Sequence, residues 1–203
     1  QVFAPRGSSS RLLALVTRYG AKITWTDAGA GLGGAVDEAA DWARKAADRM
    51  YVDGYRREAV RDAYAAIAAE VLQALEGNLL GAFITSVTTG GTFRHVAREL
   101  RQTHPALQVG GAVLLDMEFP ELSEHQFNVL RRFNDAEVWA LRDEIARKEG
   151  LLLGPKGAAC VGLALALQET ISADEPIVAL NPDSGQRYLG WEKEPLFAKG
   201  YQP

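Results

Sequence analysis

The stretch LLGAFITSVTTGGT, residues 79–92, indicates the fold of this chain more clearly than any other part of the sequence. Residues 79–87 form a continuous apolar run with β-branched side chains, which is typical of a strand buried on both faces of a sheet. The run ends at Thr88-Thr89-Gly90-Gly91-Thr92, and from Phe93 onward apolar residues recur at helical spacing. We therefore expect a strand, a tight glycine-containing turn and a helix in direct succession.

The alternation of strands and helices continues through the rest of the chain. The pattern predicts strands at 107–114 and 176–180, and helices at 58–75, 134–148 with Asn134 as N-cap, and 157–169. Strands separated by helices of this length pair in parallel through right-handed crossovers. The predicted fold class is therefore α/β, with a parallel sheet covered by helices on both faces.

A shorter segment precedes this predicted sheet. We expect a helix that follows Ser8-Ser9-Ser10 and ends near Gly20, a strand at 22–26, and an alanine-rich helix at 35–50. The helical pattern lapses at 51–55, so we place a boundary there between a domain at 1–50 and a domain at 51–203. The first residues, QVFAP, read as the end of a strand, and we expect the chain to be cut from a longer one.

Composition excludes several classes of protein. The chain has 203 residues, of which 47% are hydrophobic and 24% charged, as in globular domains with a sizeable core. Acidic residues outnumber basic ones by 26 to 22 and are interspersed with them, so we expect no nucleic-acid partner. The single cysteine, Cys160, allows no internal disulfide and suits a cytoplasmic protein. The three histidines have no ligand-like spacing, so we predict no metal site. Pro155 interrupts the longest apolar run, at 151–167, so we expect no membrane span.

Residues 88–92 are the first candidate site. Ligands of an open α/β sheet bind beyond the carboxyl ends of the strands, which is where this turn is predicted to lie. A Gly-Gly pair lets backbone N–H groups converge on an anion at the start of a helix, and the three threonines add hydroxyl donors. This combination suits a phosphate monoester. The alternative is a strand-to-helix turn whose glycines serve packing alone, and the residues by themselves leave both interpretations open.

The second candidate is the stretch NPDSG, residues 181–185, which again follows a predicted strand. Because successive side chains alternate in direction, Asp183 and Ser184 should point different ways, and one of them could face the ligand cleft. The alternative is a plain surface turn, which is the more common role of such a sequence.

The segment VTTGGT, residues 87–92, is similar to the VGTGGT phosphate loop of the cysteine synthase family, the fold-type-II pyridoxal-phosphate enzymes of the tryptophan synthase β-like superfamily. Three other stretches resemble family segments in the same order along the chain: RLLALVTRYGAKITWT at 11–26, EGLLLGPKGAA at 149–159 and NPDSGQRYL at 181–189. These collinear matches span nearly the whole chain.

The resemblance implies pyridoxal 5'-phosphate as cofactor, with Thr89, Gly90, Gly91 and Thr92 holding its phosphate. Thr88 replaces the first glycine of the family loop and would either crowd the phosphate or supply another donor. Ser184 would face the pyridine nitrogen, where a neutral hydroxyl leaves the ring less electron-withdrawing than a carboxylate would. The domain at 1–50 would be a remnant of the smaller, mobile domain of these enzymes, and 51–203 the larger cofactor-binding domain.

The resemblance also implies a reaction class. The chain, or a larger enzyme containing it, would act at the β-carbon of cysteine, serine or O-activated serine through an aminoacrylate, as a cysteine synthase-like transferase or a cysteine β-lyase. Its partners would be a small amino-acid substrate and either a second copy in a homodimer or the missing N-terminal segment. The alternative is a catalytically inactive scaffold or binding module that lacks the Schiff-base lysine.

The chain departs from the family pattern at several positions that bear on catalysis. The Schiff-base lysine and the substrate-carboxylate loop belong upstream of Gln1, so no catalytic residue is assigned, and the chain alone is expected not to be competent. The connection between Val113 and Val129 is short and lacks the family's Gly-Ile-Gly loop. Pro155-Lys156 replaces the Ser-Ser that precedes Gly-Ala-Ala. Lys156 is the one lysine near a matched segment, but it is not the family's lysine, and Cys160 is interpreted as a core residue.

Overall fold

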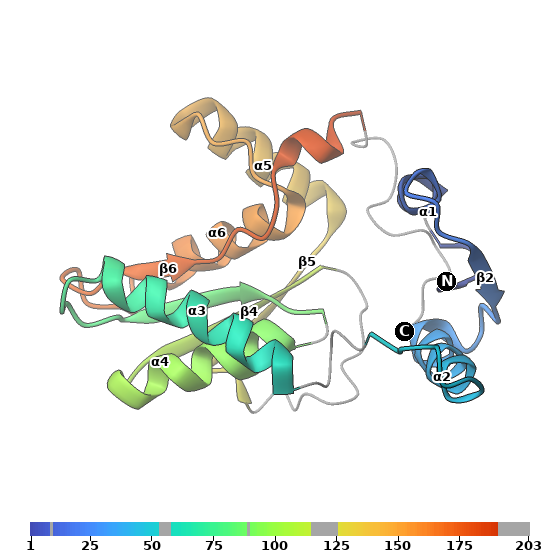
Figure 1. The fold of residues 1–203 in the computed structure, drawn as a ribbon. Coiled ribbons are helices and arrows are strands. Elements are labelled where there is room, and N and C mark those ends of the chain that lie inside the picture. Colours follow the sequence, from blue (N-terminus) through green and yellow to red (C-terminus); the bar gives the residue numbers. More distant parts are fainter. Residues whose placement is uncertain (9, 53–57, 89, 115–125, 191–203) are drawn as a thin grey trace. The chain divides into compact units, whose positions relative to one another are not determined.

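The computed structural model describes residues 1–8, 10–52, 58–88, 90–114 and 126–190. Two compact units divide the chain, one containing Gln1–Asp53 and the other made of Gly54–Glu192 (Figure 1). The candidate site residues all belong to the second unit. Among the described residues, no helix combines the length and the apolar character that a membrane crossing needs.

The first unit is built on a pair of parallel strands. Strand β1 (Val2–Pro5) pairs with β2 (Ile23–Thr26), and helix α1 (Ser10–Arg18) connects them. Gly20 follows α1 with φ of 86°, a left-handed conformation that suits the predicted helix stop. Helix α2 (Gly31–Arg44) begins and ends earlier than the predicted 35–50, and the chain after Arg44 continues in short turns.

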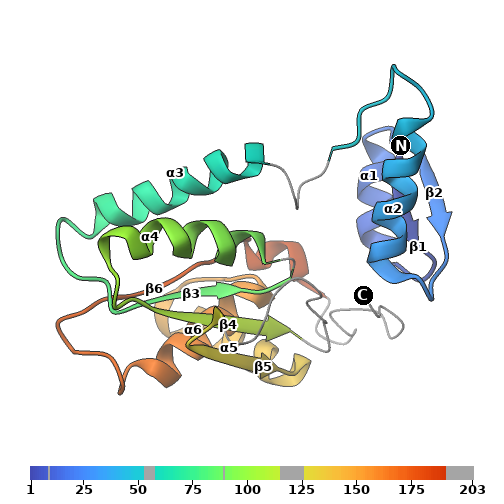
Figure 2. The ribbon, with the colours of Figure 1, turned by 90° about the horizontal axis from the view of Figure 1, so that it is seen from below.

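The second unit confirms the α/β prediction. Its sheet has the order β5-β4-β3-β6 with every pairing parallel. The strands are β3 (Ala82–Ser86), β4 (Gln108–Leu114), β5 (Val129–Phe133) and β6 (Ile177–Ala179). Helices α3 (Glu58–Ala74) and α4 (Arg98–Thr103) lie on one face, and α5 (Asp135–Glu149) and α6 (Pro155–Leu167) lie on the other (Figure 2).

The core confirms the apolar runs as buried strands. Phe83 and Ile84 of β3 and Val109 and Val113 of β4 are fully buried. Helix α6 begins at Pro155, two residues before the predicted start, because proline at the first helical position needs no N–H partner. The predicted strands and helices of this unit otherwise agree with the structure to within a few residues.

Strand β5 was not predicted. Its sequence, VLRRF, carries two arginines that break the apolar run by which buried strands are recognised. The strand lies at the edge of the sheet, where Arg131 donates a hydrogen bond to Glu137 at 2.5 Å and its guanidinium lies 4.5 Å from the centre of the Phe133 ring. Most of the short connection that precedes β5, at 115–125, lies outside the described residues.

Asn134 caps α5 as predicted, and its replacement by alanine should measurably destabilise the fold. The Asn134 side chain accepts a hydrogen bond from the Glu137 N–H at 2.9 Å. We expect Asn134→Ala to lower the free energy of unfolding by about 1 kcal/mol in urea titrations. Asn134→Asp keeps the acceptor and should cost less, so equal losses in the two variants would contradict the capping role.

Candidate functional site

The two candidate loops leave the same edge of the sheet. Strands β3 and β6 are parallel neighbours, so their carboxyl ends lie side by side. The turn at 88–92 follows β3, and the turn at 181–185 follows β6. Backbone hydrogen bonds from Val87 to Ala112 and from Leu180 to Ile84, both 2.9 Å long, extend the pairing to the start of these turns.

The loop after β3 has the backbone conformation that its glycines predict. Gly90 adopts φ of 77°, which favours glycine, and its carbonyl accepts a 2.8 Å hydrogen bond from Arg94. Gly91 and Thr92 are already helical, and the Thr92 hydroxyl makes no capping bond to the helix. Thr88 is half-buried, and Thr89 lies outside the described residues. The loop therefore offers backbone N–H groups and hydroxyls at the start of a helix.

The helix after this loop begins with a π-helical turn. The turn η1 (Phe93–Ala97) leads directly into α4. Such turns occur frequently at functional sites. No feature of the sequence predicted this departure from regular α-helix.

Tyr64 of α3 closes one side of the loop. A Cβ atom built on Gly91 would lie 3.0 Å from the Tyr64 hydroxyl and 3.4 Å from its ring. The Tyr64 ring also stacks on His95 of η1, with 5.5 Å between the ring centroids. Position 91 thus has little room for any side chain, and Tyr64 is a neighbour of the candidate loop that the sequence did not indicate.

The turn after β6 is held against the start of α6. Gly154 donates a 3.0 Å backbone hydrogen bond to Asp183, and Gly185 donates one of 2.9 Å to Leu152. Ser184 is exposed, and its Oγ accepts a 3.3 Å hydrogen bond from the Gln186 N–H at the start of the short helix η3 (Gly185–Tyr188).

Asp183 points the other way. Its Oδ2 accepts a hydrogen bond from the Tyr188 hydroxyl, and its Oδ1 is buried without a partner. Burial, reinforced by Asp183, raises the pKa of Tyr188. The alternation predicted for residues 183 and 184 is present, and it is the carboxylate that faces inward.

Helix α6 contributes the remaining titratable side chains of this edge. Burial lowers the pKa of Lys156, and the nearby Asp183 and Cys160 oppose that shift. Cys160 is fully buried, and its burial raises the pKa of the thiol to about 12, while Lys156 and a backbone hydrogen bond at Ser86 act in the opposite direction. Lys156 and Cys160 are one helical turn apart, so both side chains lie on the face of α6 turned toward the end of β3.

Cys160 should be inert in the folded protein. With a pKa of about 12, only about one thiol in ten thousand is ionised at pH 8, and no solvent reaches the sulfur. We expect a thiol-reactive dye to label the native protein at a small fraction of its rate with the urea-unfolded protein, which should take up one equivalent. Rapid native labelling would contradict the assignment of Cys160 to the core.

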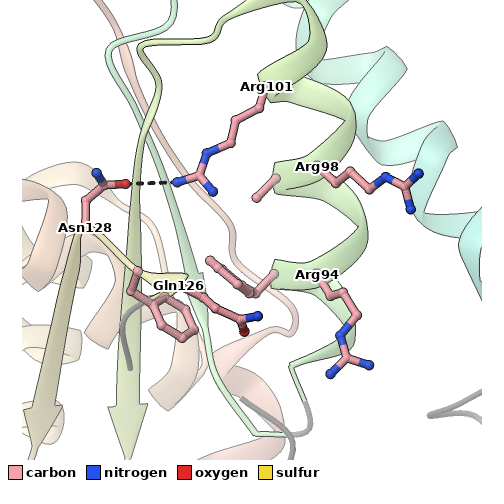
Figure 3. A pocket seen from close by; sticks show the side chains of 8 residues that line it. Arg94, Arg98, Arg101, Gln126 and Asn128 are labelled. Atoms are coloured by element: carbon pink, nitrogen blue, oxygen red, sulfur yellow. Dashed lines mark hydrogen bonds between the residues drawn. The ribbon is translucent and has the colours of Figure 1, made fainter. Parts of the chain in front are cut away.

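A separate cavity of about 350 Å³ lies beside α4 and is lined by residues 93–94, 97–98, 101 and 126–128. Arg101 donates a 3.0 Å hydrogen bond to Asn128 across it, while Arg94 and Arg98 extend away from Asn128 (Figure 3). None of residues 88–92 lines this cavity. Its three guanidinium groups do not converge on one point.

Comparison with known proteins relates the whole arrangement to one family. The family profile described as "Pyridoxal-phosphate dependent enzyme" matches residues 1–183. A probable cysteine synthase of Bacillus subtilis is 25% identical over 91% of this chain and 67% of its own length. An O-acetylserine dependent cystathionine beta-synthase of the same organism is 30% identical over 62% of this chain and 47% of its own length.

Solved structures agree with the fold. An O-ureido-L-serine synthase superimposes with a TM-score of 0.79 at 21% identity, covering 96% of this chain and 69% of the other. A hydrogen sulfide-producing enzyme gives a TM-score of 0.79 at 19% identity, covering 95% of this chain and 65% of the other. The chain thus spans about two thirds or less of the length of these relatives.

Proposed function

Because the chain belongs to the family of pyridoxal-phosphate dependent enzymes, we propose that residues 88–92 hold the phosphate of pyridoxal 5'-phosphate at the carboxyl edge of the sheet. The observation that carries this proposal is the conformation of the loop after β3. Gly90 takes a left-handed φ, and a Cβ atom at Gly91 would lie 3.0 Å from the Tyr64 hydroxyl, so glycine suits both positions at the start of a helix, where backbone N–H groups can bind an anion.

The residues present fit this cofactor. Thr88 and Thr92 can add hydroxyl donors beside the backbone N–H groups, as a phosphate monoester requires. The buried Oδ1 of Asp183, in the turn that follows the neighbouring strand β6, lacks a partner within the described residues and can accept a hydrogen bond. When bound, the cofactor would supply the electron sink for reactions of an amino acid, and the protein would supply binding and orientation.

The proposed reaction is that of the relatives. We propose that the chain, or an enzyme that contains it, acts at the β-carbon of cysteine, serine or O-activated serine, as a cysteine synthase-like transferase or a cysteine β-lyase. The cysteine synthase and cystathionine beta-synthase relatives support this class. A cytoplasmic location, a homodimer, and the division into a smaller mobile domain at 1–50 and a cofactor domain at 51–203 are parts of the same proposal.

A non-catalytic binding module is the second candidate. The observation that favours it is the replacement of the family's Ser-Ser by Pro155-Lys156, which places a desolvated amine at the start of α6. A module of this kind would keep the phosphate loop and bind the cofactor without turning over an amino acid. The two candidates therefore share the anion site and differ in activity.

The proposal is tested by adding pyridoxal 5'-phosphate to the chain and reducing the mixture with borohydride. We expect saturable binding, seen as a change in the cofactor's absorption, that inorganic phosphate competes away. We expect no stoichiometric reduced adduct by mass spectrometry, because none of the lysines here matches the family's. Absence of saturable binding would contradict the anion site, and an adduct on Lys156 would contradict noncovalent binding.

A further inference from the structure

Tyr64 of α3 carries a hydroxyl that the described fold does not use. Within the part of the chain that the structure describes, this hydroxyl makes no hydrogen bond. Tyr64 is half-buried, and its oxygen is not one of the described side-chain atoms that are both buried and unpaired, so water can still reach it. The Tyr64 hydroxyl is therefore an accessible donor without a partner in the described fold.

The ring of Tyr64 is held in place by its neighbours. It packs against the apolar core that includes Phe93 and Val96, and it stacks on His95 with 12° between the ring planes. Helix α3 lies alongside η1 and α4 on the same face of the sheet (Figure 2). A stacked neighbour contacts the face of a ring, so His95 leaves the hydroxyl, which lies in the ring plane, open. Because the ring is already ordered, a ligand that meets the hydroxyl costs little conformational entropy in the protein.

The hydroxyl lies at the start of the helix that follows the loop after β3. Residues 91–103 form one continuous helical run, in which Gly91 is the first residue. A Cβ atom on a helical residue tilts toward the N-terminus of the helix, and the unpaired N–H groups of the first turn point the same way. A Cβ atom built on Gly91 would lie 3.0 Å from the Tyr64 oxygen. The hydroxyl is thus beside the helix end to which these N–H groups point.

We propose that the Tyr64 hydroxyl donates a hydrogen bond to the phosphate monoester that binds at the loop after β3. The inference rests on the proposed function and adds to the loop a donor from a separate helix, α3. Hydrogen bonds to an ionised acceptor are roughly twice as strong as those between neutral groups, so one hydroxyl has a measurable effect on affinity. Glycine at position 91 leaves the space that the hydroxyl occupies, and Tyr64 closes the anion site on the side of α3.

The test compares Tyr64→Phe, which removes only the hydroxyl, with the unchanged chain. Affinity for pyridoxal 5'-phosphate is measured by absorption titration, and affinity for inorganic phosphate by competition. We expect Tyr64→Phe to weaken both by about tenfold, as the loss of one hydrogen bond to a charged group does. Unphosphorylated pyridoxal should bind both chains equally. Tyr19→Phe is the matched control, because Tyr19 is 82% exposed in the other unit, and it should change none of these affinities.

Urea titration without ligand separates binding from folding. The Tyr64 hydroxyl has no partner within the described residues, so its removal should leave the urea midpoint of unfolding unchanged. A lower midpoint for Tyr64→Phe would show that the hydroxyl serves the packing of α3 rather than a ligand, and it would overturn the inference.

The binding outcomes also distinguish the inference from the proposed function. If Tyr64→Phe binds pyridoxal 5'-phosphate as tightly as the unchanged chain, the inference is wrong while cofactor binding stands. A loss for the cofactor without a matching loss for inorganic phosphate, or an equal loss for pyridoxal, would place the hydroxyl at another part of the cofactor and overturn the inference. Failure of the unchanged chain to bind pyridoxal 5'-phosphate would refute the proposed function itself, and the inference with it.

Discussion

Replacing Gly185 by alanine should lower the free energy of unfolding by about 3 kcal/mol, measured by urea titration. A Cβ atom at this position would lie 2.4 Å from the Leu153 carbonyl oxygen and 2.8 Å from Leu152 Cγ. The first of these atoms belongs to the backbone, so no change of rotamer relieves the overlap. Relief requires the turn after β6 to separate from the start of α6, which breaks the 2.9 Å hydrogen bond from Gly185 to Leu152.

Gly33 provides the matched control for this substitution. It lies in α2, and a Cβ atom built on it meets nothing within 4 Å. Gly33→Ala should therefore stabilise the protein slightly, since alanine favours a helix by up to about 1 kcal/mol over glycine. A loss for Gly185→Ala no larger than the change for Gly33→Ala would show that the turn and α6 are not in contact as described.

Gly91→Asp should weaken the binding of pyridoxal 5'-phosphate by about a hundredfold. The new carboxylate would enter the space between the loop and Tyr64 and repel the ligand's phosphate. Two like charges about 5 Å apart at a partly buried site repel by roughly 3 kcal/mol, which corresponds to that factor. Equilibrium titration followed by cofactor absorption or by tryptophan fluorescence measures the change.

Gly91→Asn separates the charge from the volume of the side chain. The amide has nearly the same shape as the carboxylate, so it should displace Tyr64 to a similar extent but repel the phosphate far less. We expect the affinity of Gly91→Asn to fall between those of the unchanged chain and Gly91→Asp. Unchanged affinity in Gly91→Asp would mean that phosphate does not bind at this loop, and equal losses in both variants would assign the effect to shape alone.

The sequence predicted those parts of the fold that depend on local pattern. The apolar run at 79–87 became the buried strand β3, and Asn134 caps α5 as its type and position indicated. Strand β5 escaped prediction because an edge strand tolerates Arg131 and Arg132, whose charges remove the apolar signal. A regular apolar pattern in the sequence marks a buried element, and a strand that is only partly buried shows little of that pattern.

The candidate site was also predictable only where it depends on local sequence pattern. The glycines of the loop after β3 follow from the local turn, whereas the contact of Tyr64 with that loop joins residues far apart in the sequence. The alternation of Asp183 and Ser184 was predicted, but which of the two faces inward depends on how the turn packs against Gly154. Packing of this kind between distant segments is not encoded in the spacing of residues within either segment.

The central claim, that the loop after β3 binds the cofactor phosphate, is tested most directly by backbone amide NMR during titration with pyridoxal 5'-phosphate and, separately, with unphosphorylated pyridoxal. We predict that the phosphorylated ligand gives its largest shift changes at the amides of Gly90, Gly91 and Thr92, and that pyridoxal leaves these amides nearly unchanged. Shifts confined to Arg101 and Asn128 beside the cavity of Figure 3, or equal shifts with both ligands, would contradict the claim.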